Sequence, residues 1–100
     1  MNFHYRLSLS AKRNLQEISD YLVEKAGEAV ALGVLTSIME TIITLADHPE
    51  AGIAASQFGA GIRKFPSGMY VIYYRPRAKG VDILHVFHGS RDQKKALSGE

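Results

Sequence analysis

GIRKFPSGMYVIYYRPRAKGVDILHVFHGSRD, residues 61–92, is the stretch of sequence that decides the fold. It is rich in Tyr, Val and Ile, which favour β-strands. Two turn sequences interrupt it, Pro66-Ser67-Gly68 and Arg77-Ala78-Lys79-Gly80. The pattern therefore predicts consecutive antiparallel strands over residues 62–65, 69–75 and 81–88.

The middle predicted strand is apolar on both faces, which is typical of a central strand. Its tyrosines, Tyr70, Tyr73 and Tyr74, are interpreted as core residues rather than as a platform for stacking bases. In the last strand, simple alternation places Ile83 and Phe87 on one face, and it places Leu84, Val86 and His88 on the other.

The N-terminal part of the chain predicts one strand and one helix. Residues 3–9 alternate apolar and polar, which indicates a half-buried strand with Phe3, Tyr5, Leu7 and Leu9 inward. Ser8 or Ser10 can then cap a helix that ends at Gly27. The apolar stripe of this helix keeps to one face and consists of Ala11, Leu15, Ile18, Leu22 and Ala26.

A second helix is predicted over residues 28–46, because the His48-Pro49 step cannot continue it. Its apolar residues cover more than one face, so either the helix is sandwiched between its neighbour and the sheet, or part of it awaits another chain. Residues 49–60 are interpreted as a loop with room for a turn of helix. The order β-α-α-β-β-β predicts a single α+β domain over residues 1–100, with a helical hairpin on one face of a small antiparallel sheet.

Charge is distributed unevenly along the chain. Residues 61–95 contain eight Lys or Arg against two Asp, a net charge of +6, whereas residues 1–60 contain four basic and seven acidic residues, a net charge of −3. There is no cysteine, so neither disulfides nor thiolate metal sites are expected. No run of 18 apolar residues is present, so we expect no membrane span and a cytoplasmic protein.

The candidate chemical residues are sparse. His85 and His88 are three apart on a predicted strand, so they should project to opposite faces, a spacing that is poor for a shared metal ion. His88 is either a structural histidine at a strand end or a general acid or base near neutral pH. No metal-ligand spacing, nucleotide-binding glycine loop or nucleophile motif is found, and no metal or cofactor is expected. Arg63, Arg75, Arg77 and Lys79 form either a solvated rim or a polyanion-binding surface.

Several segments match a known family in order and spacing. The most specific part is His88-Gly89-Ser90-Arg91-Asp92 after an apolar strand, preceded by Arg63-Lys64-Phe65-Pro66 and Tyr73-Tyr74-Arg75-Pro76. The other matching segments are Tyr5-Arg6-Leu7-Ser8, Ala11 with Leu15, Ile18 and Tyr21, Leu45-Ala46-Asp47-His48-Pro49 with Gly52, and Gly61-Ile62. In these respects nearly the whole chain resembles the ParE toxins of the RelE/ParE superfamily.

This resemblance implies a toxin of a type II toxin–antitoxin pair that inhibits DNA gyrase without catalysing a reaction. It also implies a ParD-like antitoxin, bound in a heterodimer or heterotetramer. On this basis the candidates for target contact are Arg63, Arg75, Arg77, His88 and Arg91. The candidates for antitoxin binding lie on the second helix and are Leu32, Leu35, Met39 and Ile43.

The sequence departs from its relatives at position 85, which is His where they often carry Arg. The alternative function is a ribosome-dependent mRNA endonuclease of the RelE type, as in sister families that often use a tyrosine near the C-terminus. This chain has no tyrosine after Tyr74, so its catalytic set looks incomplete. A third alternative is a degenerate toxin that only binds its antitoxin.

Overall fold

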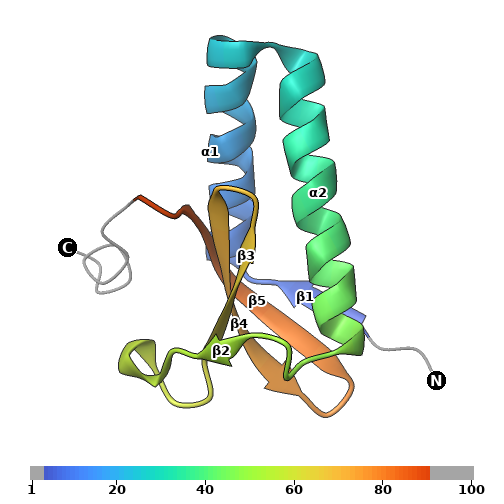
Figure 1. The fold of residues 1–100 in the computed structure, drawn as a ribbon, viewed down its shortest axis with the longest axis vertical. Coiled ribbons are helices and arrows are strands. Elements are labelled where there is room, and N and C mark those ends of the chain that lie inside the picture. The colour runs from blue at the N-terminus through green and yellow to red at the C-terminus, as the bar shows by residue number, and fades with distance from the viewer. Residues whose placement is uncertain (1–3, 91–100) are drawn as a thin grey trace.

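The computed structural model describes residues 4–90. Its elements are β1 (His4–Leu7), α1 (Leu9–Ala26), α2 (Glu28–Asp47), β2 (Ile53–Ala54), the 3-10 turn η1 (Ser56–Phe58), β3 (Arg63–Ser67), β4 (Tyr70–Arg77) and β5 (Gly80–His88). The two helices form an upright hairpin whose turn extends well beyond the sheet (Figure 1). The predicted α+β class and the helical hairpin are confirmed.

The sheet has five strands in the order β1-β5-β4-β3-β2. Neighbours from β2 to β5 pair antiparallel, but β1 runs parallel to β5, with His4 opposite Gly80 and Leu7 opposite Ile83. The sheet is therefore mixed rather than purely antiparallel. No local turn joins β1 to β5, because both helices and the strands β2 to β4 lie between them in the chain.

The first helix begins and ends where its capping residues require. The Oγ of Ser8 accepts a hydrogen bond of 2.9 Å from the backbone N–H of Ala11, which confirms the predicted serine cap. Gly27, at a φ of +96°, ends α1 and donates its N–H to carbonyls of the last turn. Such a positive φ suits glycine because it has no Cβ. Of the predicted stripe, Ala26 is exposed at the hairpin tip, where no sheet lies beneath it.

The predicted inward face of the first strand is wrong at Leu9 and only partly buried at Tyr5. Leu9 is 64% exposed and is the first residue of α1, since the strand already ends at Leu7. Tyr5 lies opposite Val81 on the core-facing side, as expected, but it is 37% exposed because β1 is an edge strand with only β5 beside it. Leu7 packs against the core as expected. Phe3 lies outside the described residues.

The main core lies between the helices and the sheet. The buried residues of α2 in this core are Ile38, Ile42, Leu45 and Ala46, which pack with residues of β4 and β5 and with Ala11 and Ile18 of α1. The buried residues of α2 pack in the core between the helices and the sheet, whereas Leu32 and Ile43 stay exposed, so the helix is covered on one side and presents apolar residues on another. By length and composition alone α2 could also cross a membrane, but the core helix of a soluble protein meets the same criteria.

A second, smaller core covers part of the opposite sheet face. Its buried residues are Ala55, Ile62, Tyr73 and Phe87, and Phe58, Val71 and Leu84 pack around them. The segment predicted as a loop thus contains β2 and η1 and forms this cover. Tyr70, Tyr73 and Tyr74 are all buried, which confirms their interpretation as core residues.

A β-bulge changes the faces of the last strand. Tyr73 lies opposite His85 and Tyr74 opposite Ile83, so Leu84 is an extra residue in the ladder. As a result Ile83 and Val86 both pack in the main core, whereas Leu84 and Phe87 pack in the second core. The prediction that Ile83 and Phe87 share a face is therefore wrong, because strict alternation fails at the bulge.

Candidate functional site

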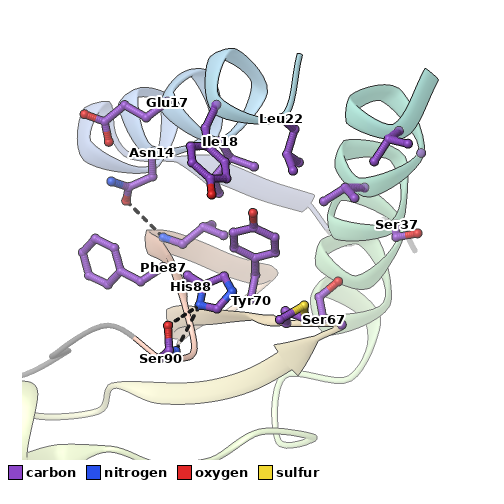
Figure 2. A pocket seen from close by; sticks show the side chains of 17 residues that line it. Asn14, Glu17, Ile18, Leu22, Ser37, Ser67, Tyr70, Phe87, His88 and Ser90 are labelled. Carbon is purple, nitrogen blue, oxygen red and sulfur yellow. Dashed lines mark hydrogen bonds between the residues drawn. The ribbon is translucent and has the colours of Figure 1, made fainter. Parts of the chain in front are cut away.

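An open groove of about 1110 Å³ lies between the helical hairpin and the sheet. Most of its wall is apolar. In Figure 2, Ile18 and Leu22 of α1 face Tyr70 and His88 of the sheet across this space, with Ser37 and Ser67 at its other side. The apolar residues that line the groove are Ile18, Tyr21, Leu22, Val30, Val34, Met69, Tyr70, Val86 and Phe87.

Small side chains explain why the groove remains open. Gly33 and Ser37 of α2, and Ser67 and Gly68 beside the β3–β4 turn, line it but fill little volume. Nothing lies within 4 Å of the position that a Cβ would take on Gly33 or Gly68. Larger residues at these positions would occupy part of the space, so the small side chains help to keep the groove open.

Polar contacts hold the walls of the groove at a fixed separation. Asn14 Oδ1 accepts a hydrogen bond of 3.0 Å from the backbone N–H of Val86 (Figure 2), which fixes α1 on β5. On the other side, Thr41 Oγ1 donates to Ser67 Oγ at 3.2 Å and ties α2 to β3. Because both helices are fixed to the sheet, the groove is preformed.

His88 lies at the end of β5, at one end of the groove. Its Nδ1 accepts a hydrogen bond of 3.1 Å from the backbone N–H of Ser90, and Ser90 Oγ lies 2.7 Å from the same atom. The ring also makes an edge contact with Tyr70, with ring centroids 5.4 Å apart. This arrangement stabilises the turn after the strand, as the structural interpretation of His88 predicts.

The arginine candidates do not share one face of the sheet. Arg63 lies opposite Tyr74, on the helix side, and its Nη1 donates to the carbonyl of Gly52 at 2.6 Å. Arg75 and Arg77 alternate with core-facing residues of β4 and project to the other side. Arg91 lies outside the described residues. The basic residues therefore do not form a single arginine cluster.

Arg75 and Arg77 are exposed and make polar contacts of their own. Arg75 Nε donates to the carbonyl of Ala60 at 3.1 Å. Arg77 Nη1 forms an ion pair of 2.7 Å with Asp82. Both guanidinium groups remain accessible to a large partner.

The antitoxin candidates divide into two kinds. Leu32 and Ile43 are 69% and 51% exposed. Leu35 and Met39 are half-buried and pack against the main core. None of these four residues lines the groove. They form instead an outer flank of α2 (Leu32, Leu35, Met39 and Ile43), which is a second apolar surface.

His85 and His88 project to opposite faces, as predicted. The ring of His85 stacks on Phe87 of the second core at a centroid distance of 5.1 Å. Its Nδ1 atom is buried and has no hydrogen-bond partner among the described residues. Burial lowers the pKa of His85, which favours the neutral ring. No group of three or more potential metal ligands is found within residues 4–90.

Sequence reasoning missed the residues that line the groove and the pairing of Arg6 with Asp82. The groove residues Val30 and Val34 are four apart, which marks a helix face, but only the fold shows what lies opposite. Arg6 Nε binds Asp82 Oδ1 at 3.0 Å across 76 residues of sequence. No sequence signal gives that pairing, because it depends on the parallel register of β1 and β5.

Comparisons with known proteins identify the class of protein. A chain in a solved structure, the chromosomal ParDE toxin–antitoxin system from P. aeruginosa, has the same fold, with a TM-score of 0.73 at 20% identity. The match covers 86% of this chain and 95% of that one. At this identity the likeness shows the fold, a helical hairpin on a small sheet.

Sequence comparison shows the family. Residues 5–93 match the family described as ParE toxin of type II toxin-antitoxin system, parDE. Toxin ParE1 of Caulobacter vibrioides is 33% identical over 93 residues, which are 93% of this chain and 96% of that protein. The chain belongs to the ParE toxin family of type II toxin–antitoxin systems.

Proposed function

We propose that this ParE toxin inhibits DNA gyrase in the cytoplasm by binding it as a protein, without catalysing a reaction. The observation that carries the proposal is the match of residues 5–93 to the ParE toxin family. The resemblance of this chain to ParE toxins implies gyrase as the target. The exposed guanidinium groups of Arg75 and Arg77 are the described target-contact candidates that a large partner can reach.

The dispersion of the basic candidates supports binding rather than cleavage of RNA. A ribonuclease needs groups close together to activate the 2′-hydroxyl and to stabilise the phosphorane. Here Arg63 is bound to the carbonyl of Gly52 on the helix side, whereas Arg75 projects from the other face. His88 lies at the groove, in contact with Ser90.

Gyrase inhibition is tested with the purified chain in a DNA supercoiling assay. We expect loss of supercoiling and accumulation of cleaved DNA, and a weaker effect of the Arg75→Ala/Arg77→Ala variant at equal concentration. The matched control is Arg13→Ala/Lys25→Ala, which removes two exposed charges from α1. Normal supercoiling together with rapid mRNA loss in cells would favour the endonuclease. Unaffected growth would favour a degenerate toxin.

We also propose that a ParD-like antitoxin neutralises this toxin by placing an amphipathic helix in the groove. A helix binds such a site through apolar residues spaced three and four apart, which are buried against a matching apolar wall. The groove offers that wall on α1, α2 and β4 through Ile18, Val30, Val34 and Tyr70. The outer flank of α2 is available for a continuing segment of the same partner.

Antitoxin binding is tested by placing one charge on each surface. Val30→Asp alters the groove at an exposed position, Leu32→Asp alters the outer flank, and Val23→Asp on α1 is the control. We expect Val30→Asp to weaken binding of the neighbouring gene's antitoxin at least about tenfold, because an unpaired charge would be buried. Val23→Asp should leave binding unchanged. A loss confined to Leu32→Asp would place the antitoxin on the flank.

A further inference from the structure

A basic hollow lies at the β1 side of the sheet, away from the groove. It is lined by His4, Tyr5, Arg6, Arg77, Lys79, Val81 and Asp82, and its volume is about 170 Å³. Four of these seven residues are basic, and Asp82 is the one carboxylate among them. Three strands contribute to it, since β1 and β4 both flank β5.

Asp82 holds two guanidinium groups in place. Arg6 binds it through Nε at 3.0 Å and Nη2 at 3.3 Å, and Arg77 binds it through Nη1 at 2.7 Å. The side chains of Arg6 and Arg77 remain 68% and 50% exposed, whereas that of Asp82 is 22% exposed. Each guanidinium has five N–H donors, so both keep donors that face solvent.

The charges of the basic hollow are not balanced. Arg6, Arg77 and Lys79 contribute three positive charges against the single negative charge of Asp82, a net of +2. Arg75 lies opposite Asp82 in the β4–β5 register, but its guanidinium group binds the carbonyl of Ala60 and does not line the hollow. Asp82 therefore orients the guanidinium groups without neutralising the site, and an anion is the ligand that this arrangement favours.

We propose that the basic hollow binds phosphodiester groups of a nucleic acid backbone. Planar guanidinium groups match phosphate oxygens in geometry and charge. The side chain of Tyr5 lies on the other sheet face, that of Val81 and Leu7, so the cations of Arg6, Arg77 and Lys79 are the groups that would contact the phosphates. An acidic peptide is the competing ligand, and its binding is measured in the test below. The hollow shares Arg77 with the proposed gyrase contact, but the binding experiment contains no gyrase and does not depend on gyrase inhibition.

Binding is tested by fluorescence anisotropy with the purified full-length chain. The probes are labelled 20-mers of one sequence as single-stranded DNA, duplex DNA and single-stranded RNA, at 25–200 mM KCl. We expect affinity to fall as salt rises, with a log–log slope near −0.7 per phosphate contact for single strands. Comparing the affinities for single-stranded DNA, duplex DNA and single-stranded RNA identifies which nucleic acid supplies the phosphates.

Two variants with matched controls localise the contact. Arg6→Gln/Arg77→Gln should weaken binding at least about tenfold at 50 mM salt and reduce the salt slope, since each lost phosphate contact lowers the slope by about one. The second variant is Lys79→Gln. It leaves the ion pairs of Asp82 with Arg6 and Arg77 in place, so it remains informative if the double variant loses stability. The controls are Arg13→Gln/Lys25→Gln and Lys25→Gln, which remove the same charges from α1.

Three outcomes would overturn the proposal. They are the absence of salt-dependent binding at 25 mM KCl, equal weakening by the test and control variants, and binding of a 20-residue polyglutamate peptide as tight as that of the oligonucleotides. Normal supercoiling in the gyrase assay would refute the proposed function but would leave this binding result unaffected.

Discussion

The phenol oxygen of Tyr74 accepts a hydrogen bond of 2.8 Å from the backbone N–H of Gly52. The same hydroxyl donates to the carbonyl of Pro49 at 2.7 Å, and Arg63 donates to the carbonyl of Gly52. A buried residue of β4 thus fixes the segment that follows α2. Burial raises the pKa of Tyr74, so the hydroxyl keeps the proton that it donates.

Tyr74→Phe should lower the free energy of unfolding by about 1–3 kcal/mol, because it leaves the N–H of Gly52 buried without a partner. The control is Tyr21→Phe, since Tyr21 is 59% exposed. Urea denaturation of the two variants provides the measurement. Equal stability of the two variants would show that the hydroxyl contributes nothing to the fold.

Arg63→Ala should reduce stability as well as any toxicity. Its guanidinium group donates to Gly52 from a half-buried position, and loss of a charged hydrogen bond of this kind costs about 1.5–3 kcal/mol. Arg75→Ala should change stability by less than about 1 kcal/mol, because Arg75 is exposed. Thermal melts and soluble protein levels, recorded beside growth inhibition, separate the two effects. A loss of toxicity at Arg63 with unchanged melting would instead indicate direct target contact.

Gly80→Ala should detach β1 from the sheet. Gly80 has a φ of +130° and lies opposite His4, so an added Cβ would collide with the His4 backbone. We expect a loss of several kcal/mol, because backbone cannot shift as a flexible side chain can. The control is Gly33→Ala in α2, which has open space and should gain about 0.5–1 kcal/mol of stability. Urea unfolding of both variants tests this, and a stable Gly80→Ala protein would contradict the β1–β5 register.

Local signals were sufficient to predict much of this fold. The Ser8 cap, the end of α1 at Gly27 and the burial of Tyr73 and Tyr74 all follow from residues close in sequence. The parallel pairing of β1 with β5 does not, because it joins residues 76 apart. The bulge at Leu84 was also beyond prediction, since it depends on how β5 fits against β4.

The candidate sites were harder to predict than the fold. The charge pattern identified Arg77 but not its partner Asp82 or the neighbouring Arg6, which meet only through β1. The small residues that leave the groove open, such as Gly33, carry no functional signature in sequence. Sites that depend on nonlocal pairing therefore required the structure.

His85→Phe should remove part of the acid sensitivity of the fold. Burial lowers the pKa of His85 in the folded state below its usual value of about 6.5. Because the unfolded chain binds this proton more readily, stability falls as the pH drops below about 6.5, and the loss is complete once the pH is below the folded pKa. Phenylalanine keeps an aromatic ring against Phe87 and has no proton to bind. Urea unfolding between pH 7.5 and pH 5 should therefore show that the variant gains stability relative to the parent at the acid end. The other histidines are common to both proteins and cancel in this difference, so parallel stability curves would show that His85 does not sense pH.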